Sequence, residues 1–170
     1  MPLFQQGHAL SIGVVDYHDP GLRLPRPITL DDARGVTDAL KDAAVAAYPS
    51  NQVHLLPDAG SQATRAEVIR ALEQLAGRVS PADTVFIFFC GHGVLGEDGE
   101  YHFATQDTVL TTGYRVKTGT GLSKTRLLEL LRAVKAQKLL LDEAASPRDR
   151  GSGLGELCEL GGVGYRKILV

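Results

Sequence analysis

Residues 83–90, with the sequence DTVFIFFC, form an almost wholly apolar run that ends just before Gly91-His92-Gly93. A run of this length and composition predicts a strand that is covered on both faces, as the central strand of a parallel sheet is. Further apolar runs at residues 8–17, 52–56 and 138–141 indicate other strands. We therefore expect residues 83–90 to lie at the centre of a sheet.

Helical patterns separate the strands. Residues 31–48, 65–79 and 124–136 carry apolar side chains at helical spacing, and Thr64 and Ser123 stand where helix caps are expected. These segments therefore predict helices that connect the strands.

A hairpin is expected over residues 100–110, after a glycine-rich loop at residues 91–99. The order β-α-β-α-β-hairpin-α-β predicts an α/β fold whose mostly parallel central sheet has helices on both faces. Reactive groups of such folds lie beyond the carboxyl ends of the strands. The places to search are therefore those that follow Cys90 and Leu141.

The chain of 170 residues is expected to hold one domain, over residues 1–146. Residues 147–165 are rich in glycine and predict a flexible linker of the kind that is cut during processing. Residues 166–170 (RKILV) look like the start of a following strand that lacks a partner. We expect the natural polypeptide to continue beyond them.

The bulk composition excludes several classes of function. The net charge is −2, so no nucleic-acid partner is indicated. The apolar runs are too short to span a membrane, and residues 1–7 lack the features of a secretory signal. The two cysteines do not make a disulfide framework, so a cytoplasmic location is expected.

The first candidate site is the motif Cys90-Gly91-His92-Gly93. A histidine just beyond a buried strand, flanked by glycines, can approach a substrate backbone and act as a general base near neutral pH. Gly93 carries no side chain, so its N–H can reach a developing oxyanion. The alternative is a histidine in an ordinary glycine turn.

The second candidate site follows residues 138–141. Asp142 and Glu143 are expected to end this strand, and the small residues after them allow another chain to approach closely. Asp142 could meet a cationic group. Taken alone, acids in this place are as readily helix caps or solvated side chains.

Together the two sites resemble those of caspase-like cysteine peptidases, the metacaspases in particular. Residues 88–93 (FFCGHG) resemble the family's aromatic-x-Ser-Gly-His-Gly motif, and residues 139–146 (LLLDEAAS) resemble its strand followed by Asp-x-Cys-x-Ser-Gly. Residues 8–17 resemble its first strand, and Asp32-Ala33 the start of its first helix. Position 144 lies 52 residues after the histidine, close to the spacing of about 50 in caspases. The resemblance implies the large subunit of a peptidase domain.

The resemblance makes His92 the catalytic base, Gly93 an oxyanion donor and Ala144 the occupant of the nucleophile position. Alanine has no nucleophilic group, so the chain as written is expected to be inactive. Other departures are Cys90 in place of a serine and Pro147 in place of a glycine. The retained machinery favours an engineered Cys-to-Ala replacement. The alternative is a natural pseudoprotease that acts as a binding or regulatory module.

In metacaspases a basic residue precedes the cut. The resemblance places the substrate-binding acids at Asp32 and Asp142, with Cys90 beside them, and two carboxylates in one cleft bind Arg or Lys strongly. Classical caspases instead use arginines to bind aspartate, and Arg23 and Arg26 lie in a loop where such a residue could stand. We expect the basic preference, because no arginine flanks the histidine or the Ala144 motif.

A peptidase that cuts after basic residues could process its own linker. The candidate processing sites are Arg148, Arg150, Arg166 and Lys167. The expected partners are a protein or peptide substrate, a small-subunit segment of the same polypeptide and a regulatory activator protein. Neither nucleic acid nor a membrane is expected as a partner.

No cofactor is expected. Glu97, Asp98 and Glu100 leave calcium open, although their spacing is not that of an EF-hand, and no Cys/His set has the spacing of a zinc site. A nucleotide-binding α/β protein is a further alternative, with residues 91–99 or 151–164 around a phosphate. Neither segment is a Walker A motif or a correctly placed Gly-x-Gly-x-x-Gly.

Overall fold

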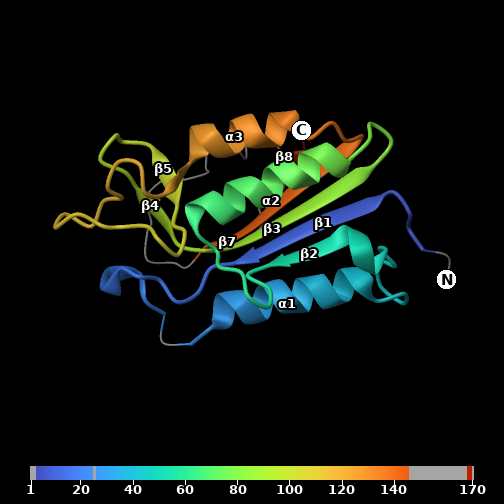
Figure 1. Ribbon diagram of the computed structural model, residues 1–170, viewed down its shortest axis with the longest axis horizontal. Coiled ribbons are helices and arrows are strands. Elements are labelled where there is room, and N and C mark those ends of the chain that lie inside the picture. The colour runs from blue at the N-terminus through green and yellow to red at the C-terminus, as the bar shows by residue number, and fades with distance from the viewer. Residues whose placement is uncertain (1–2, 25, 146–167, 170) are drawn as a thin grey trace.

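The central sheet is mostly parallel, as the sequence predicts. The computed structural model describes residues 3–24, 26–145 and 168–169, and for residues 138–145 and 168–169 it describes the backbone (Figure 1). The strands are β1 (Gly7–Gly13), β2 (Val53–Leu56), β3 (Thr84–Gly91), β7 (Lys138–Ala145) and β8 (Ile168–Leu169). Their order is β2-β1-β3-β7-β8, and only the pairing of β7 with β8 is antiparallel among these described strands.

The apolar run at residues 83–90 forms most of β3, which is hydrogen-bonded to β1 on one side and to β7 on the other. Successive residues of a strand face opposite sides of the sheet. Ile87 and Phe89 therefore lie in one core, and Phe88 and Cys90 lie in another. The need to fill two cores explains why the run is apolar throughout.

Helices cover both faces of the sheet: α1 (Ile28–Lys41) lies on one face, and α2 (Arg65–Arg78) and α3 (Lys124–Ala133) lie on the other (Figure 1). The predicted caps are present. The Thr64 hydroxyl accepts the Glu67 N–H at 3.3 Å, and the Ser123 hydroxyl accepts the Arg126 N–H at 3.2 Å. The prediction of an α/β fold with helices on both faces is confirmed.

The first helix differs from its prediction, because α1 ends at Lys41 and the prediction extended it to residue 48. The Asp42 carboxylate accepts the Ala44 N–H at 2.7 Å, which closes a local turn. Ala47 then adopts a positive φ of 56°, outside the helical region. The helical spacing of small residues beyond 41 was therefore misleading.

The hairpin was predicted at residues 100–110 but lies earlier in the chain. It consists of β4 (Gly93–Leu95) and β5 (Tyr101–Phe103), and β6 (Leu122–Ser123) pairs with β5. The turn is closed by the Gly96 N–H, which donates to the Glu100 carbonyl at 2.7 Å, and Gly99 has a positive φ of 77°. The hairpin thus begins directly after His92 and includes the glycine-rich segment that was expected to be a loop.

Strand β7 extends further than predicted. Asp142 and Glu143 were expected at its end, but they pair within it, opposite Phe88 and Phe89 of β3. The strand continues to Ala145 because β3 itself continues to Gly91 and offers partners that far. The acids therefore occupy strand positions rather than a cap or loop.

The segment at residues 166–170 was expected to lack a partner, but Ile168 and Leu169 pair with Leu141 and Leu140 of β7. The predicted linker at residues 147–165 lies outside the described residues. So do Arg148, Arg150, Arg166 and Lys167. Among the described residues, no helix has the length and apolar character that crossing a membrane requires.

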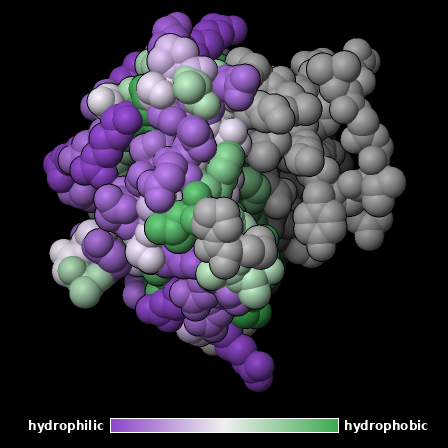
Figure 2. Space-filling view, turned by 90° about the vertical axis from the view of Figure 1, so that its right-hand side faces the viewer, coloured by the Kyte–Doolittle hydropathy of each residue, from purple (hydrophilic) through white to green (hydrophobic). Residues whose placement is uncertain are grey.

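The parallel strands end on the side of the molecule where β4, β5 and the short 3-10 helix η1 (Pro20–Leu22) lie (Figure 1). A second 3-10 helix, η2 (Ser50–Gln52), precedes β2. Figure 2 shows the opposite end of the molecule, where the strands begin; its coloured part is mostly hydrophilic, with apolar residues near the middle of the view. The candidate site residues therefore belong at the end that carries β4, β5 and η1, as parallel sheets generally arrange them.

Candidate active site

His92 lies between β3 and β4 and is only 8% exposed. Its backbone N–H donates to the Tyr17 hydroxyl at 3.1 Å, and the two rings lie 5.2 Å apart in a tilted arrangement. Its side-chain Nε2 lies 2.9 Å from the Leu22 carbonyl oxygen. Backbone and imidazole are thus both held by the segment that follows β1.

The Leu22 contact determines which nitrogen of the His92 imidazole carries the proton. A carbonyl oxygen can only accept a hydrogen bond, so Nε2 must carry a proton in this contact. In the neutral imidazole Nδ1 is then the nitrogen without a proton. The arrangement suits a general base whose orientation is fixed by a backbone acceptor.

The glycines on either side of His92 are required by two tyrosines. A Cβ atom at Gly91 would lie 2.9 Å from the Tyr17 hydroxyl, and one at Gly93 would overlap the Tyr101 hydroxyl. A side chain at either position would therefore force the neighbouring tyrosine to move. The Gly-His-Gly pattern therefore has a packing reason.

The ladder pattern of the hairpin fixes the direction of the Gly93 N–H. The His92 carbonyl accepts the Ala104 N–H at 2.8 Å, so His92 and Ala104 form a hydrogen-bonded pair at the start of the β4–β5 ladder. Hydrogen-bonded and non-hydrogen-bonded pairs alternate in an antiparallel ladder. The alternation turns the Gly93 N–H away from β5 and out of the hairpin.

Cys90 lies beside Asp32, its thiol 3.8 Å from the Asp32 Oδ2. Burial and then the negative charge of Asp32 raise the pKa of the Cys90 thiol to about 12. Cys90 is therefore a neutral thiol at physiological pH and makes a poor nucleophile. Asp32 itself is exposed on the first turns of α1, so its carboxylate is accessible from solvent.

The register of β7 brings position 144 to the same end of the sheet. Ala144 pairs with Cys90 and Ala145 pairs with Gly91, so β3 and β7 end side by side, one residue before His92. Asp142 pairs with Phe88, two positions earlier on the same strand. The backbone therefore brings Asp142, Ala144 and His92 to adjacent strand ends, with Asp32 near Cys90 on the α1 side.

Sequence reasoning assigned no role in the site to two of its features. Tyr17 holds the backbone of His92, but it was noted only as the last residue of the segment 8–17 that resembles the family's first strand. The Leu22 carbonyl holds the imidazole, and a backbone atom leaves no residue signature at all. Burial raises the pKa of Tyr17 well above its usual range, so its hydroxyl stays protonated.

A cavity of about 330 Å³ adjoins the segment that follows β1. It is lined by Asp16, Tyr17, His18, Arg23 and Leu24. Arg23 is exposed, and its Nε donates to the Tyr17 carbonyl at 3.4 Å. Another cavity, of about 250 Å³, lies between β2 and α2 and shares no lining residue with this one.

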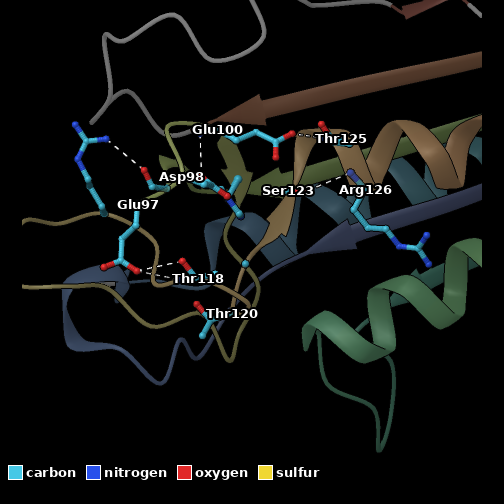
Figure 3. A network of polar contacts seen from close by, with 12 residues as sticks. Glu97, Asp98, Glu100, Thr118, Thr120, Ser123, Thr125 and Arg126 are labelled. Carbon is cyan, nitrogen blue, oxygen red and sulfur yellow. Dashed lines mark hydrogen bonds and ion pairs between the residues drawn. The ribbon is translucent and has the colours of Figure 1, made fainter.

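The acids of the β4–β5 turn do not converge on one point. Glu97 turns to Thr118, and Glu100 accepts the Thr125 N–H at the start of α3 (Figure 3). Asp98, Glu100 and His102 do lie close enough for ligand atoms within 4.8 Å of one another.

The group is better explained without a metal. Asp98 lies 3.0 Å from the His102 Nε2, and the Glu100 N–H and then His102 hold the pKa of Asp98 below its usual range. The Nδ1 of His102 has no hydrogen-bond partner among the described residues. A metal-bound histidine normally donates that second N–H to an acceptor. We therefore interpret the group as a hydrogen-bonded pair, Asp98 with His102, that closes the turn.

A mostly parallel sheet whose central strand leads into a glycine-flanked histidine, beside the end of the next strand, agrees with the resemblance of the sequence to caspase-like domains. The sequence model of the caspase domain family matches residues 6–144. The chain therefore belongs to the caspase domain family.

One solved structure with this fold is that of protein GSU0716 from Geobacter sulfurreducens. Its TM-score is 0.55 at 18% sequence identity, and the match covers 85% of this chain. The chain spans 50% of the length of that structure. No curated protein matches the chain. The structural likeness supports the fold, and the family match supports a cysteine peptidase domain.

Proposed function

We propose that this domain is a caspase-type cysteine endopeptidase that cuts after arginine or lysine, and that Ala144 makes the chain as written inactive. The observation that carries the proposal is the contact of Asp32 with Cys90 at the end of β3. His92 lies two residues further along the chain, and position 144 pairs with Cys90 across the sheet. The contact and the pairing support the proposal because they bring the proposed acid, base and nucleophile position to the ends of β3 and β7.

In the proposed reaction a cysteine at position 144 attacks the carbonyl carbon of the scissile peptide as its thiolate. His92 takes the thiol proton on Nδ1 and then gives it to the leaving amine. The N–H groups of Gly93 and of residue 144 donate to the oxyanion. Water then hydrolyses the thioester and restores the thiol. Alanine keeps the backbone donor but cannot form the thioester.

The proposed preference for arginine or lysine before the cut rests on the carboxylates of Asp32 and Asp142. Asp32 is accessible to solvent, and with Asp142 it would present two negative charges to one substrate side chain. Arg23 favours the opposite preference, for an acidic residue, because it lines the cavity after β1. Asp16 lines the same cavity and offsets that charge. We therefore keep the basic preference as the proposal.

A second candidate function is supported by Ala144 itself. A natural pseudoprotease would keep the fold and the proposed substrate-binding acids Asp32 and Asp142, but it would bind a peptide rather than cut it. An alanine codon in the unmodified gene would favour this function, whereas a cysteine codon would exclude it.

The test is the variant Ala144→Cys, assayed with peptides that differ only in Arg, Lys, Asp or Ala before the cut. We expect cleavage of the Arg and Lys peptides, and we expect His92→Ala in the same background to lower the rate by about 10³-fold or more. A longer polypeptide that continues past residue 170 is assayed in parallel. Absence of cleavage by both would overturn the proposal, and preference for the Asp peptide would reverse its specificity.

The same cysteine variant tests the processing sites and the proposed partners. Cleavage after Arg148, Arg150, Arg166 or Lys167, detected by mass spectrometry of the incubated chain, would make the linker its own substrate. A small-subunit segment and an activator protein in the cytoplasm are proposed to complete the site.

A further inference from the structure

The Leu22 carbonyl that holds His92 belongs to η1, a single 3-10 turn of three residues. Isolated turns of this length are marginal, because few hydrogen bonds offset the loss of backbone entropy. The carbonyl must nevertheless stay within 2.9 Å of the imidazole Nε2 for the contact to persist. Contacts from residues outside η1 are therefore needed to hold the Leu22 carbonyl in place.

Asp19 supplies that support with both carboxylate oxygens. Oδ1 accepts the Gly21 N–H at 2.8 Å and caps η1, and Oδ2 accepts the Leu110 N–H at 2.7 Å. The Asp19 backbone carbonyl also accepts the Leu22 N–H at 3.1 Å. One residue thus ties η1 to the segment at residues 104–121, which is 91 positions away along the chain at Leu110.

We propose that Asp19 is a positioning residue for His92: its carboxylate fixes η1, and η1 holds the Leu22 carbonyl against the imidazole. The proposal rests on the proposed peptidase function for its catalytic meaning. It also makes residues 104–121 a support of the active site, because Leu110 holds one oxygen of Asp19. No contact with substrate is required of Asp19.

A second link keeps this region attached when Asp19 is changed. The His18 N–H donates to the Gln106 carbonyl at 2.9 Å, and the Leu22 side chain is only 4% exposed within the larger core. Loss of the Asp19 carboxylate should therefore loosen η1 without unfolding the domain. Variants of Asp19 can therefore change the position of His92 without lowering the stability of the whole domain.

The direct test uses NMR of the ¹⁵N-labelled chain with Ala144 in place. His92 should show a slowly exchanging Nε2–H proton, assigned by its loss in His92→Gln. In Asp19→Asn, whose side-chain NH₂ would face one of the two backbone N–H donors, we expect this proton to exchange at least about tenfold faster. Asp42→Asn is the matched control, because Asp42 also accepts a local backbone N–H but lies at the end of α1.

A second, milder variant keeps the proposal testable if Asp19→Asn does not fold. Asp19→Ser can still cap η1 through its hydroxyl but cannot reach Leu110 as well, so it should show an intermediate exchange rate. Circular dichroism and thermal melting must show both variants folded. A folded Asp19→Asn chain with the exchange rate of the unchanged chain would overturn the proposal.

The kinetic test uses the Ala144→Cys background. Asp19→Asn should lower kcat by about 10-fold to 100-fold, because misplacing a general base slows the chemical step. KM should change less than about twofold, because the acids proposed to bind substrate are untouched. An unchanged kcat would count against the role. If Ala144→Cys cleaves nothing, the peptidase proposal fails, and the exchange measurement still decides whether Asp19 positions His92.

Discussion

At the scale of single residues, Tyr17 is the side chain on which the backbone of His92 depends. Its hydroxyl accepts the buried His92 N–H and fills the space left by Gly91. Removing the hydroxyl would leave that N–H without an acceptor, and a buried unsatisfied donor is costly. We therefore expect Tyr17→Phe to destabilise the domain by about 1–3 kcal/mol.

Urea denaturation of Tyr17→Phe measures this loss. Tyr114→Phe is the matched control, because Tyr114 is 75% exposed and its change should leave the midpoint unaltered. Equal midpoints for the two variants would mean that the Tyr17 hydroxyl contributes nothing to holding His92.

Cys90 gives a second test at this scale. Because its pKa is raised to about 12, the thiolate fraction at pH 8 is very small and alkylation should be slow. Asp32 contributes to the shift through its charge and its hydrogen bond, so Asp32→Asn should lower the Cys90 pKa and speed alkylation. Burial is the larger cause, so the Cys90 pKa should stay above its ordinary value in the variant.

The measurement is the iodoacetamide labelling rate against pH in a Cys158→Ser background, read by mass spectrometry. Asp31→Asn serves as the control, since Asp31 pairs with Arg34 on the exposed side of α1. If Asp31→Asn and Asp32→Asn gave the same rate, the contact between Asp32 and Cys90 would not exist in solution.

At the scale of elements, what could be predicted from sequence was what depends on local patterns. The apolar run of β3, the periodicity of α2 and α3, and the Thr64 and Ser123 caps involve neighbours within a few residues. The position of His92 at the end of β3 was predictable for the same reason.

The hairpin and the end of β7 could not be predicted, because each depends on a distant partner. β4 forms where Gly93 lets Tyr101 lie against the backbone, and no local pattern reveals that pairing. Asp142 and Glu143 read as a strand end, yet the extension of β3 to Gly91 keeps them in the ladder. The Leu22 carbonyl and the bridge made by Asp19 escaped prediction because they use backbone groups.

At the scale of the whole molecule, the two faces of the sheet are anchored unequally. The helices on one face bury large apolar side chains: Val68, Leu72 and Leu75 from α2, and Leu127, Leu130 and Leu131 from α3. On the other face α1 fully buries the smaller side chains of Thr29, Ala33 and Thr37, and its Val36 and Leu40 are partly buried against the core. Each buried Val or Leu contributes about 1.5–3 kcal/mol, and the smaller side chains of α1 contribute less.

We therefore expect α1 to open at a lower free energy than α2, because local unfolding follows the apolar area that anchors an element. Amide hydrogen exchange followed by mass spectrometry should show residues 28–41 exchanging at least about tenfold faster than residues 65–78. Thr37→Val should bring the exchange rate of α1 closer to that of α2, because the added methyl group increases the buried apolar area. The change loses little, since the Thr37 hydroxyl donates only to the Ala33 carbonyl of its own helix. Equal protection of the two helices would contradict the argument. A difference as expected would mean that Asp32, which α1 carries, belongs to the more mobile wall of the proposed site, so a bound basic peptide should slow exchange in α1 more than in α2.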